Sequence, residues 1–131
     1  MIELQYDRRG HSFLPDDTSA WKPLYATEEV VAGDKVIDAH FFVGAANWYL
    51  VKFNPVENLA FGYADLGDPS SAEWGYFSLD ELEQLNVHRL FIVERDLQWT
   101  PKPAREALHP RAWQSQDLSL IHISEPTRLR R

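Results

Sequence analysis

The chain has 131 residues, a net charge of −7 and no cysteine, which suits one domain and excludes a disulfide framework, a thiolate zinc site and a cysteine nucleophile. The negative charge argues against direct binding of nucleic acid, because phosphate contacts need clustered lysine and arginine. No apolar run approaches the roughly 20 residues of a membrane span, and the first ten residues lack a signal-peptide core, so we expect a cytoplasmic protein that does not bind membranes.

The predicted elements begin after an irregular N-terminal arm. Residues 1–22 are polar and interrupted by Pro15, which favours loop structure. Residues 30–113 carry nearly all the periodic signal, and the domain is predicted over residues 23–113. Residues 114–131 lose that signal and are predicted to be a disordered or non-native tail.

The first predicted strand covers residues 36–43. Alternate residues of a strand share one face, here called a parity, and one of the two parities is wholly apolar. Asp38 and His40 lie on the other parity, so the apolar one should face the core. Its members are Ile37, Ala39, Phe41 and Val43. Turn residues then separate two further strands, over 48–53 and 59–64. The last of these has a small-residue parity that would let another segment approach closely; it consists of Ala60, Gly62 and Ala64.

A fourth strand over residues 74–77 leads into a helix. Ser78 and Glu81 form a capping box, which predicts a helix from Ser78 to about Leu85. A fifth strand is expected over residues 90–96. Thr100 and the following proline are expected to open a last short helix over 104–108. Successive hairpins followed by short helices indicate a single α+β domain, with a four- to five-stranded antiparallel sheet and two short helices.

The acidic residues are unevenly distributed. No lysine or arginine lies between Lys52 and Arg89, and that stretch carries seven carboxylates, namely Glu57, Asp65, Asp68, Glu73, Asp80, Glu81 and Glu83. One interpretation is a solvated face that keeps the protein soluble. The other is a surface that binds a basic protein partner. Acidic cytosolic domains are common, which favours the solvated face, whereas the absence of interleaved basic residues supports the binding surface, because solubility alone does not require it.

A second candidate site joins a histidine with carboxylates. Asp38 and His40 lie two residues apart on one strand, as do Glu94 and Asp96 on another. Together they would suit a divalent metal or acid–base catalysis, or they are polar surface residues. Alternation puts Arg95 on the opposite face, where we expect it to pair with a buried carboxylate or to cap a helix end.

Most of the aromatic rings are expected in the core. Three of them are candidates to line a groove for a partner: Trp48, Tyr63 and Trp74. Stacking on nucleic acid is disfavoured because the neighbouring charges are acidic.

Four segments occur in an order that resembles the bacterial domain-of-unknown-function family number 2958, over about residues 23–108. They are residues 23–29, the Trp48-Tyr49 hairpin, the run Gly75 to Leu82, and Glu94-Arg95-Asp96-Leu97. The resemblance implies a small α+β domain from a mobile genetic element and supplies no activity and no catalytic residues. Residues 119–131 resemble a translated sequencing adapter, which would give them no evolved role.

The sequence therefore leads to one principal hypothesis and two alternatives. The principal one is a non-enzymatic accessory domain of a mobile element that binds a basic host protein through the seven carboxylates, competing there with nucleic acid. It needs no cofactor. The alternatives are a small metal-dependent hydrolase that uses Asp38, His40, Glu94 and Asp96, and a structural scaffold domain.

Overall fold

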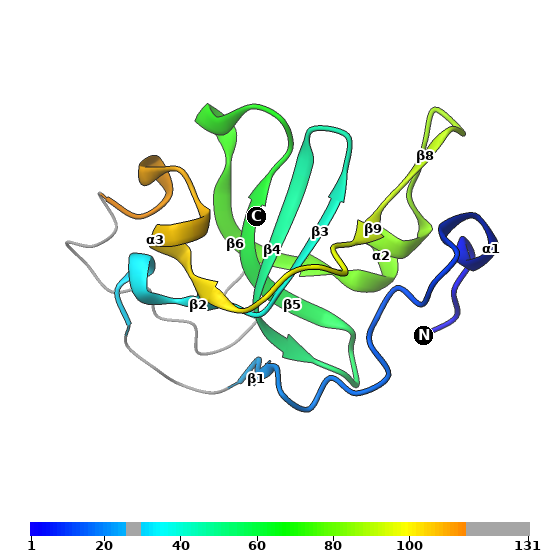
Figure 1. Ribbon diagram of the computed structural model, residues 1–131, viewed down its shortest axis with the longest axis horizontal. Coiled ribbons are helices and arrows are strands. Elements are labelled where there is room, and N and C mark those ends of the chain that lie inside the picture. Colours follow the sequence, from blue (N-terminus) through cyan, green and yellow to red (C-terminus); the bar gives the residue numbers. More distant parts are fainter. Residues whose placement is uncertain (26–29, 115–131) are drawn as a thin grey trace.

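The computed structural model describes residues 1–25 and 30–114 of the chain; the predicted tail over 115–131 lies outside the described residues. Its main sheet (Figure 1) has the strand order β6-β5-β4-β3-β9 with antiparallel pairing, and a sixth strand, β1, pairs in parallel with the end of β4. These strands are β1 (Lys22–Pro23), β3 (Ala39–Val43), β4 (Ala46–Asn54), β5 (Leu59–Asp65), β6 (Glu73–Ser78) and β9 (Glu94–Arg95).

Short helices and two small ribbons surround this sheet. The described α-helices are α1 (Tyr6–Arg9), α2 (Leu79–Gln84) and α3 (Ala104–Ala107), and the 3-10 turns are η1 (Ala32–Asp34), η2 (Pro69–Ser71) and η3 (Pro110–Ala112). The ribbons pair β2 (Val36–Ile37) with β10 (Lys102–Pro103), and β7 (Asn86–Val87) with β8 (Phe91–Ile92). The predicted single α+β domain is confirmed, with six strands in its sheet and three short α-helices among the described residues. None of those helices is long and apolar enough to cross a membrane.

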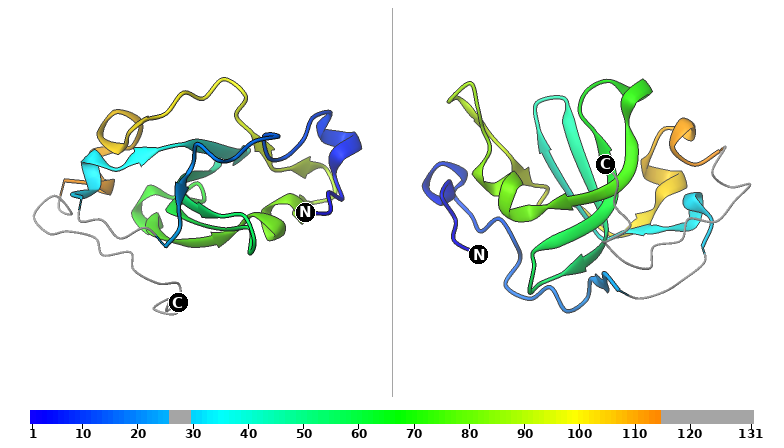
Figure 2. Two further views of the ribbon diagram at one scale, coloured as in Figure 1. Left: turned by 90° about the horizontal axis from the view of Figure 1, so that it is seen from below. Right: turned by 180° about the vertical axis from the view of Figure 1, so that it is seen from behind.

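The two faces of the sheet are covered by different parts of the chain. The predicted core parity of β3 is buried at Ala39 and Phe41, where it packs with Phe13 of the N-terminal arm and Leu79 and Leu82 of α2. The opposite face packs against the C-terminal segment, through a cluster that includes Ile37, Val51, Tyr63, Ala104, Leu108 and Ala112. Seen from below (Figure 2, left), β2 and the C-terminal segment lie on one side of the sheet, and α2 lies on the other.

The N-terminal arm is more ordered than the sequence indicates. It contains the single helical turn α1, and its backbone is held by Arg95, whose guanidinium donates to the carbonyls of Ser12 and Phe13. Arg95 therefore binds backbone oxygens of the arm, in place of the buried carboxylate or helix end that the sequence suggested.

Two predicted elements differ in their ends. The strand expected over 90–96 divides at Val93, because β8 pairs with β7 whereas β9 pairs with β3. Thr100 does not cap a helix: the chain continues into β10, and Pro103 precedes α3 without a side-chain cap. The cap at Ser78 is present, since its hydroxyl accepts a hydrogen bond of 3.2 Å from the Glu81 amide.

Candidate functional site

The seven carboxylates predicted to share a surface fall into separate places. The upper acidic group, which consists of Asp65, Asp68 and Glu73, lies where β5 ends and β6 begins; the lower acidic group, which consists of Glu57, Asp80 and Glu81, lies at the β4–β5 turn and in the first turn of α2. In Figure 1 the β5–β6 connection lies at the top of the molecule and the β4–β5 turn lies at the bottom. Strand β5 separates them by roughly 20 Å at 3.3 Å per residue. They are two surfaces, not one.

The seventh carboxylate, Glu83, is not on a surface. Its side chain is 0% exposed and forms an ion pair of 3.1 Å with Arg9, which is equally buried. It also accepts hydrogen bonds from the backbone amides of Leu4 and Gln5. The expected surface position is therefore wrong for Glu83, because it shares with Leu79 and Leu82 the face of α2 that packs inward.

The upper acidic group is bound by neutral donors. Asp65 accepts from the amide of Gly67, and Asp68 from the amide and hydroxyl of Ser70. The Ser70 hydrogen bonds hold the pKa of Asp68 below its ordinary value. Within residues 1–25 and 30–114, none of the three carboxylates forms an ion pair with lysine or arginine. The positive charge of Arg111 adds to the lowering of the Asp68 pKa without forming an ion pair with it.

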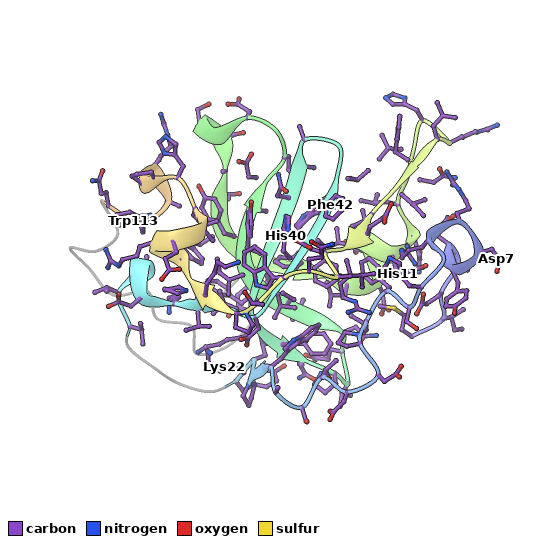
Figure 3. The ribbon with its side chains drawn as sticks, in the orientation of Figure 1. Asp7, His11, Lys22, His40, Phe42 and Trp113 are labelled. Atoms are coloured by element: carbon purple, nitrogen blue, oxygen red, sulfur yellow. The ribbon has the colours of Figure 1, made fainter. Side chains whose placement is uncertain are left out.

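A row of rings crosses the sheet beside this group. Strand pairing puts His40, Tyr49, Tyr63 and Trp74 next to one another on the face covered in part by the C-terminal segment. The neighbouring row on the same face runs from Phe42 through Asn47 to Asp65. Figure 3 shows His40 and Phe42 along β3 in the middle of the molecule. Asp65 thus belongs both to the upper acidic group and to this aromatic face.

The two tyrosines of the row remain neutral phenols at physiological pH. Burial, reinforced by the nearby Asp65 carboxylate, raises the pKa of Tyr49 and of Tyr63. Their hydroxyls therefore present hydrogen-bond donors next to a carboxylate. Aromatic faces beside carboxylates suit a cationic group, which the ring quadrupole and the negative charge both attract.

A shallow hollow joins the aromatic row to the upper acidic group. It has a volume of about 470 Å³, and its lining includes Tyr63, Trp74, Glu73, Ser70 and Arg111. The Trp74 indole is fixed there by a hydrogen bond of 2.9 Å to the Ala112 carbonyl. Of the three aromatic groove candidates, Tyr63 and Trp74 line this hollow, although Tyr63 is itself only 6% exposed, and Trp48 packs in the core cluster on the other face of the sheet.

Only two of the four residues suggested for catalysis meet. His40 Nδ1 lies 2.9 Å from an Asp96 carboxylate oxygen. Asp38 instead accepts from the Lys22 amide, and burial raises the pKa of Asp38 despite that bond. Glu94 lies 3.8 Å from His11. The described parts of the chain contain no group of three or more histidine and carboxylate side chains arranged to hold a metal ion.

The second ring nitrogen of His40 also has a side-chain partner. Nε2 lies 2.7 Å from Asn47 Oδ1, and the Asn47 amide nitrogen donates to the Ala45 carbonyl, which fixes the amide orientation. Nε2 must then carry a proton and donate to Asn47. The ring stacks on Tyr49 at a centroid distance of 4.7 Å. Both ring nitrogens therefore have a side-chain partner among the described residues.

The hydrogen bond between His40 and Asp96 predicts how the free energy of unfolding changes at acidic pH. Burial alone would raise the pKa of Asp96, but hydrogen bonds from His40 and the Gln98 amide, together with nearby positive charge, lower it below its usual 3.8. A carboxyl group whose pKa is lower in the folded than in the unfolded chain stabilises the fold at any pH above its pKa in the unfolded chain. That stabilisation is lost as the pH falls through the lower pKa of the folded state. The Asp96→Asn variant should therefore unfold more easily than wild type near pH 6, and the difference should vanish as pH falls from about 4 to 2. Urea titrations across this range measure it, and a constant difference would contradict it.

Sequence reasoning missed the residues that depend on strand register. Tyr49 lies opposite Tyr63 and His40 only because β3, β4 and β5 pair as they do. Asn47 carries no signal of its own, since a turn asparagine is common. The alternation of polar side chains at Asn47 and Tyr49 is the one pattern that points to a partly open face.

Comparison with known proteins places the chain in a family. The model of a family described as "Protein of unknown function (DUF2958)" matches residues 25–108, which span β2 to β10 and all of α2 and α3. No curated protein and no solved structure matches the chain. The matched segment covers well over half of the chain and contains both the aromatic row and the upper acidic group, and on that match the chain belongs to the DUF2958 family.

Proposed function

We propose that this chain is a non-enzymatic accessory domain that binds a basic protein through the upper acidic group and the adjoining hollow. The observation that carries the proposal is that Asp65, Asp68 and Glu73 form no ion pair among the described residues, while Glu73 lines the hollow with the Tyr63 and Trp74 rings and Asp65 lies close enough to Tyr63 to raise its pKa. A lysine or arginine from a partner would meet both a carboxylate and an aromatic face there.

The proposed setting is the bacterial cytoplasm, as part of a mobile genetic element. The partner would be a host protein whose basic surface otherwise holds nucleic acid, and the carboxylates would occupy positions meant for phosphates. The acidic charges would chiefly increase the association rate, and that increase would become smaller at higher ionic strength. A hydrolase is not proposed, because the two nitrogens of His40 are already bonded to Asp96 and Asn47.

The test compares two triple variants of equal charge change. D65K/D68K/E73K reverses the upper acidic group, and E57K/D80K/E81K reverses the lower one. Binding of a fluorescent arginine- and lysine-rich peptide, followed by anisotropy, should weaken about 10- to 100-fold in the first variant, since three exposed charge pairs contribute a few tenths to 1 kcal/mol each and become repulsive.

The second triple variant should bind within a few-fold of wild type. Raising the salt concentration should weaken wild-type binding and leave the first variant little changed. Equal losses in both variants would mean that net charge alone attracts the peptide. Binding that does not respond to salt would contradict the proposal directly.

A further inference from the structure

The β7–β8 ribbon projects from the body of the domain and carries exposed apolar side chains. Figures 1 and 2 show it beside α1, at the edge of the molecule away from β6. Leu90 is 69% exposed and Phe91 is 54% exposed, although each is large and apolar. Adjacent exposed apolar side chains on a projecting segment mark an interaction surface.

The tip of this ribbon is held in a costly conformation. His88 and Arg89 both have positive φ, 54° and 61°, in a turn where asparagine and glycine are the usual residues. The Arg89 and Leu90 amides close the turn by donating to the Asn86 and Val87 carbonyls. Backbone strain of this kind persists where the surrounding structure or a function requires the shape, and here it directs Leu90 and Phe91 outward.

A groove runs along the base of the ribbon. It has a volume of about 310 Å³, and its lining is more polar than apolar: Arg8 and Glu94 lie there with Phe42, Val43, Gly44, Leu90, Phe91 and Ile92. Arg8 contacts only the neutral side chains of Gln5 and Asn86. Over the described residues, neither Arg8 nor Arg89 forms an ion pair. One small area therefore presents exposed Leu90 and Phe91, a groove that they help to line, and charges of both signs.

We infer that this surface binds the same surface of a second copy of the chain. In a two-fold contact the same patch of each copy meets the other, so the patch must contain both partners of each interaction. Leu90 and Phe91 of one copy would enter the groove beside Phe42 of the other, and Arg89 would approach Glu94 across the two-fold axis. An acidic partner protein fits less well, because Glu94, whose side chain is 47% exposed, lies in the groove.

The position of the ribbon favours this pairing despite the negative charge of each copy. β9 and β6 form opposite ends of the sheet. Contact through the ribbon beside β9 would keep the two upper acidic groups at the far ends of the pair, where salt screens their repulsion. The inference does not depend on the proposed function, since it uses a different surface.

The first experiment measures mass in solution. Sedimentation of the full chain over a range of concentrations in physiological salt should show reversible formation of a dimer. Phe91→Ser should shift that equilibrium at least about tenfold toward monomer, whereas Leu97→Ser should not. Leu97 is a matched control because it is 58% exposed and lies outside the groove. Thermal unfolding of both variants should resemble wild type, because both side chains are largely exposed.

A charge exchange tests the two-fold geometry. Arg89→Glu and Glu94→Arg should each be monomeric, because each brings like charges together twice. Mixing the two variants should restore a dimer, since the mixed pair has two attractive contacts. A wild-type chain that stays monomeric throughout, a dimer that survives Phe91→Ser, or a mixture that stays monomeric would each overturn the inference.

Discussion

The Glu83→Ala variant is expected to lose about 3–5 kcal/mol of unfolding free energy, because it leaves the Arg9 guanidinium charged and buried without its partner. Both side chains are 0% exposed, and Arg9 has only one other carboxylate contact, with the partly exposed Glu3. The loss has a second source in the two arm amides that would go unsatisfied. Urea unfolding followed by tryptophan fluorescence measures it.

Two controls separate the ion pair from helix effects. Glu81→Ala changes an exposed position of the same helix and should cost under about 1 kcal/mol. The double variant Arg9→Met/Glu83→Met should lose less unfolding free energy than the single variants Arg9→Met and Glu83→Met lose together, because it removes both charges at once. Additive losses would mean that Arg9 and Glu83 do not stabilise each other.

The second large effect is expected from Gly62→Ala. A Cβ atom at Gly62 would overlap the Tyr49 carbonyl oxygen and lie 3.2 Å from Leu50 Cα. Backbone atoms in the middle of a sheet cannot move aside as a flexible side chain does, so we expect a loss at the upper end of overpacking costs, about 3 kcal/mol or more. The crowding coincides with the register shift between Leu50 and Lys52 in the pairing of β4 with β5.

Gly75 provides the matched control for this substitution. It is the direct partner of Gly62 on β6, and a Cβ atom there meets nothing within 4 Å. Gly75→Ala should be neutral or slightly stabilising, because alanine restricts the unfolded chain more than glycine does. Thermal unfolding of the two variants side by side makes the comparison. Similar melting temperatures would refute the steric argument.

The elements that sequence predicted well are those with a local cause. The alternation in residues 36–43 placed Ala39 and Phe41 in the core, and the spacing of Ser78 and Glu81 marked the start of α2. The small parity of β5 also indicated close approach at Gly62, although the neighbour is the Tyr49 backbone in the adjoining strand and not a helix. In each case the cause lies within a few residues of its effect.

The elements that sequence missed depend on distant segments. No residue near Glu83 in the sequence predicts its ion pair with Arg9, which lies 74 residues away. An acidic run in sequence was interpreted as one surface, yet β5 carries its members to two ends of the sheet. The apparent cluster of Asp38, His40, Glu94 and Asp96 needed a register that brings only His40 and Asp96 together. A linear pattern fixes which face a side chain occupies and leaves open which neighbours it meets there.

The order of the strands has a consequence for how the chain reaches this structure. β3, β4, β5 and β6 lie side by side in the order of the sequence, so each pairs with the strand made just before it. Such local pairing closes only short loops and can proceed early. The N-terminal arm, by contrast, returns across 84 residues to bond Arg9 with the Val93 carbonyl. We therefore expect the arm to dock after these strands have paired, and until it does, the inner face of α2 with the Glu83 carboxylate is exposed to water.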